Sequence, residues 1–191
     1  MVKDRKDTLN GYCAKHGAIV GAVLLLLAII FYLSTGKIND SESFEGTAST
    51  IMTILGLFFF TRLYRNSNPN VNFTYGTAFK TSFLIGLYSS LIVAFFNYLF
   101  YKFSPDALNE FLLTTQNAYL ETGLYTEGQL ESVMSLLQRF LTPGVLAFSM
   151  LFGLLVSVAI YSLIIAVFLR TKKTNIHNDT SVFDKDMSEI E

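Results

Sequence analysis

Few side chains in this sequence have a type and a spacing that could do chemistry. The two histidines, His16 and His177, have no second ligand-type residue at metal-binding spacing. The single cysteine, Cys13, can form neither an intrachain disulfide nor a cysteine-built zinc site. No serine lies in a nucleophile-elbow pattern. We therefore expect no catalytic residue, no metal site and no cofactor, and we expect that the protein is not an enzyme.

Long stretches without any ionisable side chain limit the chemistry further. Residues 17–35, 46–61, 81–101 and 140–169 contain no Asp, Glu, Lys, Arg or His. A proton relay or a coupled ion site needs such groups inside the membrane, so their absence argues against pumps and ion-coupled transporters. The most polar side chain deep in these stretches is Asn97, which we expect to form a hydrogen bond between helices. The alternative is that Asn97 lines a pore or binds a ligand.

These uncharged stretches also predict the secondary-structure elements of the chain. The 191 residues are 51% hydrophobic and 15% charged, whereas a soluble domain is about 25% charged. A helix needs about 20 apolar residues to cross a bilayer, and continuous apolar runs are not the alternating pattern of a β-barrel. We predict an all-α integral membrane bundle of four transmembrane helices, with spans at about 17–35, 46–64, 79–101 and 142–169.

The ends of this bundle are also predicted. Thr74 and Thr142-Pro143 are typical helix starts for the third and fourth spans. We expect an N-terminal cytoplasmic arm (1–15), a membrane domain (16–170) and a disordered cytoplasmic tail (171–191).

The first apolar stretch could instead be a cleaved signal peptide. It follows basic residues, and Ser34-Thr35-Gly36 is similar to a cleavage site. However, the stretch is longer than the roughly 7–15 residues of a signal-peptide core, and Phe31-Tyr32-Leu33 is bulky beside the cut. We expect that it is kept as a membrane helix.

Lys and Arg are unevenly distributed among the segments that join the spans. The N-terminal arm, the second connection and the tail are basic, through Lys3, Arg5, Lys6, Lys15, Arg62, Arg65, Lys80, Arg170, Lys172 and Lys173. The first and third connections carry most of the acids, namely Asp40, Glu42, Glu45, Asp106, Glu110, Glu121, Glu127 and Glu131. Because basic segments stay in the cytoplasm, we predict that both termini are cytoplasmic (N-in/C-in).

The third connection, residues 104–139, should contain two short amphipathic helices on the periplasmic side. Ser104-Pro105-Asp106 is a typical helix start. Thr126-Glu127-Gly128-Gln129 is a capping box, and an apolar repeat follows it at Leu130, Val133, Met134 and Leu137. These helices would either cap the bundle or lie at the lipid surface, or they would form a docking or gating element.

Small residues recur at four-residue intervals within the spans. The rows are Gly17 and Gly21 in the first span, Ser82, Gly86, Ser90 and Ala94 in the third, which Asn97 extends, and Ser149, Gly153 and Ser157 in the fourth. Helices in lipid associate through close backbone approach, which such rows permit. We expect the third and fourth spans to form a tightly packed hairpin, with the first span as a second contact face. The alternative is that the rows reflect the general Gly and Ser content of membrane helices.

Together these features resemble the bacterial inner-membrane family catalogued as domain of unknown function 4199. The resemblance covers residues 11–173 and is carried by His16-Gly17-Ala18-Ile19-Val20-Gly21, Thr74-Tyr75-Gly76-Thr77-Ala78-Phe79-Lys80, Tyr125-Thr126-Glu127 and Arg170-Thr171-Lys172-Lys173. It implies four membrane helices in a Gram-negative inner membrane. It implies no activity and no functional residues.

Two functions therefore stay open for a multi-pass protein of the cell inner membrane. The first is a non-enzymatic accessory or scaffold subunit that acts through helix–helix and periplasmic-loop contacts. The alternative is an oligomeric small-solute transporter or channel, which would need a polar path across the bilayer. The expected partners are the lipid bilayer and either another membrane protein or further copies of the chain. The net charge of −1 gives no reason to expect nucleic acid.

Overall fold

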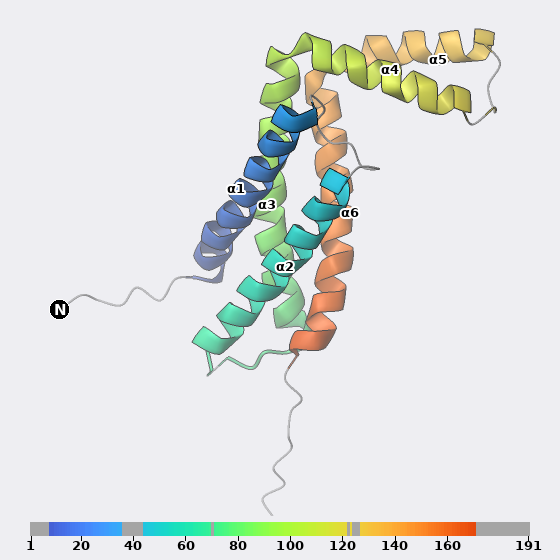
Figure 1. Cartoon of the computed structure of the whole chain (residues 1–191). Helices are drawn as coiled ribbons and strands as arrows, with labels where there is room; N and C mark the ends of the chain where they lie inside the picture. Colours follow the sequence, from blue (N-terminus) through green and yellow to red (C-terminus); the bar gives the residue numbers. More distant parts are fainter. Residues whose placement is uncertain (1–7, 36–43, 70, 122, 124–126, 171–191) are drawn as a thin grey trace, which may run out of the picture.

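The regular structure is entirely helical in residues 8–35, 44–69, 71–121, 123 and 127–170, which the computed structural model describes. The helices are α1 (Leu9–Thr35), α2 (Phe44–Ser67), α3 (Tyr75–Phe103), α4 (Pro105–Glu121), α5 (Glu127–Phe140) and α6 (Pro143–Leu169). The four long helices α1, α2, α3 and α6 stand side by side, and α4 and α5 lie across one end of them (Figure 1). The predicted tail, the start of the predicted arm and Thr126 lie outside the described residues.

The four long helices are each long and apolar enough to cross a membrane, which confirms the prediction of an all-helical fold with four such helices. The third and fourth spans begin at the predicted caps. Thr74 accepts a hydrogen bond from the backbone N–H of Thr77, and Thr142 accepts one from that of Val145. Both bonds satisfy a donor that the first turn of a helix leaves free. The start of α1, both ends of α2 and the end of α3 lie outside the predicted spans, because the helices continue beyond the apolar stretches. The ends of α1 and α6, at Thr35 and Leu169, coincide with the predicted ones.

Helices α1 and α3 run parallel to each other. Near the start of both, the Cys13 thiol donates to the carbonyl of Thr81 at 3.7 Å. Near the end of both, the rings of Tyr32 and Phe100 meet edge to face, with centroids 5.2 Å apart. A contact at each end fixes the register between the two helices over most of their length.

Helices α2 and α6 run antiparallel to this pair. The Tyr12 hydroxyl at the start of α1 donates to the carbonyl of Phe60 in the second half of α2 at 3.0 Å. The Ser162 hydroxyl near the end of α6 donates to that of Ser82 near the start of α3 at 3.1 Å. The start of α1, the connection from α2 to α3 and the end of α6 therefore share one end of the bundle, and α4 and α5 occupy the other (Figure 1).

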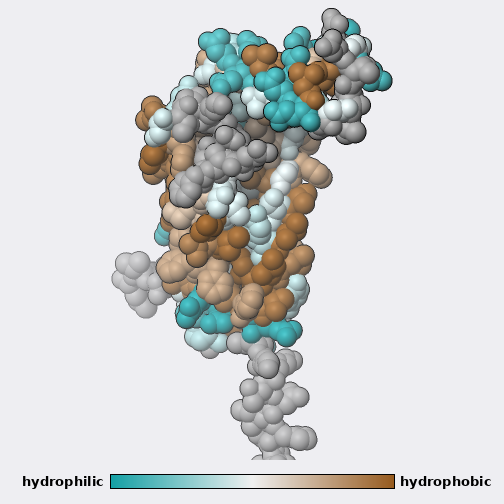
Figure 2. Space-filling view, turned by 45° about the vertical axis from the view of Figure 1, so that its right-hand side comes forward, coloured by the Kyte–Doolittle hydropathy of each residue, from teal (hydrophilic) through white to brown (hydrophobic). Residues whose placement is uncertain are grey.

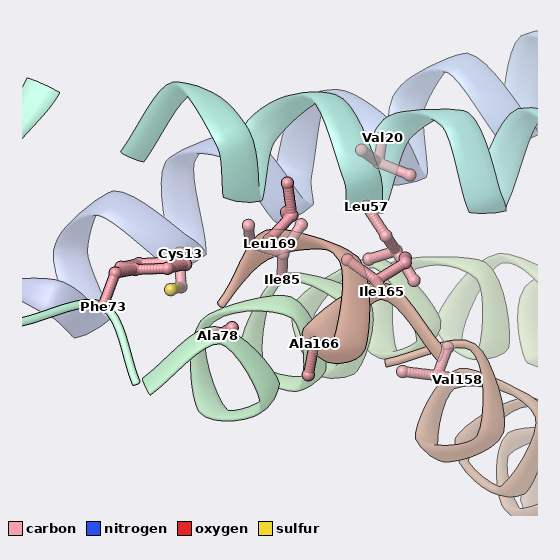
Figure 3. Packing of buried hydrophobic residues seen from close by; sticks show 10 residues of the cluster. All are labelled: Cys13, Val20, Leu57, Phe73, Ala78, Ile85, Val158, Ile165, Ala166 and Leu169. Atoms are coloured by element: carbon pink, nitrogen blue, oxygen red, sulfur yellow. The ribbon is translucent and has the colours of Figure 1, made fainter. Parts of the chain in front are cut away.

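Helix α3 lies at the centre of the bundle. Its contacts with α6 and α1 are the most extensive in the molecule, and α2 has smaller contacts with α1, α3 and α6. The largest buried cluster lies towards the end that holds the start of α1; its members are Cys13, Val20, Leu57, Phe73, Ala78, Ile85, Val158, Ile165, Ala166 and Leu169 (Figure 3). Many outward-facing side chains of the long helices are large and apolar. On the face shown in Figure 2, a mainly apolar zone lies between hydrophilic ends.

Helices α4 and α5 form a hairpin with a small core of its own. The buried residues of this core are Leu112, Leu130 and Met134, and Tyr119, Leu137 and Leu141 pack around them. After α4, the chain turns at Gly123, whose φ of 63° is a left-handed conformation that glycine adopts without strain. The hairpin thus holds its two helices together independently of the bundle core.

Candidate functional site

The interface between α3 and α6 closes around a glycine. A Cβ atom added to Gly86 would clash with Cγ1 of Val158 and lie 3.0 Å from its Cγ2. One turn earlier on α3, Ser82 is fully buried and bonded to Ser162, which is also fully buried. Small side chains on α3 thus allow α6 to approach closely, and a hydroxyl pair links the two helices.

At the interface between α1 and α3, a glycine meets the backbone of the neighbouring helix. A Cβ atom added to Gly17 would lie 2.6 Å from the backbone carbonyl oxygen of Ile85 and 2.7 Å from Cβ of Tyr88. At Gly21 an added Cβ would lie 3.1 Å from Cβ of Ile92. The backbone of α1 therefore rests directly on α3, and the pair Gly17 and Gly21 lies at this contact.

The rest of the predicted row on α3 faces the interior of the bundle. Ser90, Ala94 and Asn97 are all buried, with Asn97 only 3% exposed. The amide of Asn97 is therefore shielded from lipid.

The small residues of α6 are placed differently. Among the described residues, no atom outside the adjoining backbone of α6 lies within 4 Å of a Cβ added to Gly153. Ser149 is exposed, and the Ser157 hydroxyl donates to the carbonyl of Gly153 on its own helix at 3.0 Å. This is contrary to the expectation that the row lines the contact with the third span. The buried residues of α6 are instead Leu146, Ala147, Val158, Ser162, Ile165, Ala166 and Leu169. A β-branched side chain fills the space above Gly86, so α6 needs no glycine there.

A polar and aromatic cluster lies at the start of α1 and was not predicted from the sequence. The His16 ring stacks on Tyr12 with centroids 3.9 Å apart, and its Nδ1 hydrogen-bonds the carbonyl of Tyr12 at 2.8 Å. The centroid of the His16 ring also lies 4.7 Å from that of the Phe60 ring. The i, i+4 spacing of Tyr12 and His16 could have indicated the stacking, but the position of α2 could not be inferred from it.

Two further polar side chains lie near the end of α2, Arg65 and Thr61. Arg65 donates through Nη1 to the carbonyl of Leu169 at 3.2 Å, which satisfies an acceptor that the last turn of α6 leaves free. The hydroxyl of Thr61 is fully buried, and within the described part of the chain it has no hydrogen-bond partner.

The comparison with known families can be set beside this geometry. The profile of the family described as "Protein of unknown function (DUF4199)" matches residues 15–171. The chain belongs to this family. Comparisons with curated proteins and with solved structures give no match. The family resemblance read from the sequence is thereby confirmed.

The DUF4199 match includes the glycine contacts and the hydroxyl pair of the α1–α3 and α3–α6 interfaces, from Gly17 to Ser162, whereas Cys13 lies just before its start. Within the described ranges of this DUF4199 member, no group of three or more His, Cys, Asp or Glu side chains could hold a metal ion. His177 lies outside those ranges.

Proposed function

We propose that this DUF4199 protein is a non-enzymatic accessory or scaffold subunit of the cell inner membrane. The observation that carries the proposal is the open row of small residues on the outer side of α6. Gly17 and Gly86 are covered by neighbouring helices, whereas Gly153 has free space above it. Since small residues let backbones approach in lipid, a helix of another membrane protein fits this row.

The proposed orientation is N-in/C-in. Lys15, Arg62, Arg65 and Arg170 lie at the end of the bundle that holds the start of α1 and the end of α6. The acidic residues of the α4–α5 hairpin lie at the other end. The positive-inside rule supports a cytoplasmic position for the basic end. Reporter fusions within residues 67–72 or after Lys173 should give cytoplasmic signals, and a fusion at Gly123 should give a periplasmic signal. A periplasmic signal after Lys173 would contradict this orientation.

The bonding of the polar side chains supports a role without catalysis. Ser162 bonds Ser82, Cys13 bonds the backbone of α3, and His16 bonds the backbone of its own helix. The bonds of Ser162 and Cys13 join different helices, and that of His16 lies within α1. A proton-transfer role would require these groups to be available to a substrate.

The alternative, an oligomeric small-solute transporter or channel, has a different observation in its favour. Helix α3 carries a series of buried polar side chains along much of its length, namely Thr81, Ser82, Ser89, Ser90 and Asn97. Hydroxyl and amide groups of this kind line the paths of neutral solutes across membranes.

Purification in a mild detergent, followed by mass spectrometry, distinguishes the two. A second protein at constant stoichiometry would support the accessory role, a homo-oligomer alone would support the alternative, and a monomer without partners would contradict both. The decisive variant is Gly153→Leu, which should lose the partner and keep the melting temperature of the isolated chain, because the space above Gly153 is empty. The matched control is Phe152→Leu, a 65% exposed neighbour, which should keep the partner.

A further inference from the structure

The α4–α5 hairpin extends sideways from the end of the bundle. Its helices lie across the bundle at a steep angle and reach beyond α6 (Figure 1). The hairpin is held together by its own core around Leu112, Leu130 and Met134. In a membrane protein with four spans, an element at this position lies beside the lipid headgroups of one leaflet.

One side of the hairpin faces the bundle, and α4 identifies it. The ring of Phe111 meets that of Tyr101 near the end of α3, with centroids 6.4 Å apart. The next residue, Leu112, points into the hairpin core. Because an α-helix has 3.6 residues per turn, Leu113 then lies on the side away from the bundle, where it is 60% exposed.

The same reasoning assigns the sides of α5. A twofold axis normal to the plane of the hairpin exchanges two antiparallel helices and leaves the two faces of that plane unchanged. The residue before a core position therefore lies on the same face of the hairpin in both helices. Val133 precedes the core residue Met134 and therefore lies on the side of Phe111. Leu136 and Phe140 follow Val133 at i+3 and i+7, which places them on the same side.

This bundle-facing side of α5 is apolar and uncovered. Leu136 is 56% exposed and Phe140 is 66% exposed. The opposite side of α5 carries Ser135, Gln138 and Arg139, which are all exposed. A polar outer side and an apolar inner side are typical of a helix that lies in the membrane interface.

The apolar side also continues into the surface that faces lipid. Phe140 ends α5, and α6 begins three residues later with outward-facing Val145, 48% exposed, and Phe148, 70% exposed. We propose that the α4–α5 hairpin lies on the membrane surface with Val133, Leu136 and Phe140 inserted among the lipid headgroups and upper acyl chains. The inference goes beyond the proposed function and rests only on the membrane insertion of the four long helices.

Tryptophan fluorescence can test this arrangement directly, because the chain contains no tryptophan. Three single-tryptophan variants, Phe140→Trp, Leu113→Trp and Phe95→Trp, would be reconstituted into phosphatidylcholine and phosphatidylglycerol vesicles. Phe95 is 64% exposed in the second half of α3, within the uncharged stretch 81–101, and serves as the reference for a residue within the bilayer. Each sample would be quenched by aqueous iodide and, separately, by lipids brominated on their acyl chains.

We expect Phe140→Trp to resemble the reference. Its emission maximum should lie at a shorter wavelength than that of Leu113→Trp. Brominated lipid should quench Phe140→Trp at least about twofold more than Leu113→Trp, and iodide should quench it less than Leu113→Trp. Leu136→Trp should behave like Phe140→Trp, and it keeps the test valid if the latter variant fails to fold.

Two results would overturn the inference. The first is equal iodide quenching of Phe140→Trp and Leu113→Trp, which would show that both sides face water. The second is shielding of Phe140→Trp from iodide without quenching by brominated lipid, which would show that protein covers the surface. If brominated lipid failed to quench Phe95→Trp as well, membrane insertion and the proposed function would fail together.

Discussion

Gly86 and Gly153 occupy the same kind of sequence pattern and very different places. Each is the glycine of a row of small residues at four-residue intervals in a long apolar helix. Gly86 is buried against Val158, whereas Gly153 is exposed, and no other described helix comes within 4 Å of a Cβ added to it. The comparison teaches that a row of small residues shows where close approach is possible. Whether the approach occurs within the chain depends on how each helix is rotated about its axis.

The largest loss of stability is expected at Gly17, because the atom that covers it belongs to the backbone. Gly17→Ala should lower the free energy of unfolding by about 3 kcal/mol, the upper part of the range for overpacking. The added methyl group meets the backbone carbonyl of Ile85 at 2.6 Å, and a backbone atom cannot rotate away as a side chain can. Unfolding in mixed detergent micelles measures the change. Ala18→Leu adds more volume at the exposed neighbouring position and should have little effect; equal losses would contradict the α1–α3 contact.

Gly86→Ala should have the next largest effect, about 2 kcal/mol, because Val158 is a short, stiff side chain. Shortening the neighbour tests the contact, since the double variant Gly86→Ala/Val158→Ala should be more stable than the sum of the single effects predicts. A coupling energy of about 1 kcal/mol is expected from the double-mutant cycle. Additive effects would show that the two residues do not meet.

The hydroxyl pair of Ser82 and Ser162 should contribute less to stability than the two glycine contacts. The cycle of Ser82→Ala and Ser162→Ala should give a coupling energy of about 0.6 kcal/mol, the average for hydrogen bonds between membrane helices. Ser157→Ala is the control, because its hydroxyl bonds only its own helix. If Ser157→Ala destabilised the bundle as much as Ser162→Ala, the assigned inner and outer sides of α6 would be wrong.

Gly153→Ala should have the smallest effect and an opposite sign to Gly86→Ala. The space above Gly153 accepts a methyl group, and alanine is the better helix former by about 1 kcal/mol in water. We expect a melting temperature equal to or slightly above that of the unchanged chain in detergent. A clear decrease would show that this side of α6 is crowded within the chain.

The sequence predicted those features of the fold that depend on local pattern. Uncharged apolar runs are sufficient to identify spans, because the bilayer requires about 20 such residues whatever the partner. Thr74 and Thr142 were predictable as caps, since a cap depends only on the residues of the first turn. The inward position of Ser82 and Gly86 follows from their row, which is the main one on α3.

The rest depends on contacts between distant parts of the chain. The exposed position of Gly153 could not be predicted, because Val158 and Ser162 set the rotation of α6 through their fit to α3. The environment of His16 requires Phe60, which lies on another helix. Both examples show that a periodic pattern defines the faces of a helix and leaves open which face is occupied.

The central position of α3 has a consequence for how the bundle is made. Because the chain is synthesised from its N-terminus, α1 and α2 are made before α3, and their mutual contact is smaller than that of α1 with α3. The contact at Gly17 and the bond from Cys13 can form only once α3 has been inserted. Helix α6 can then close onto the other side of α3. Assembly of the bundle therefore requires the third helix, and a chain that ended after Ser67 would lack α3, the helix on which α1 packs.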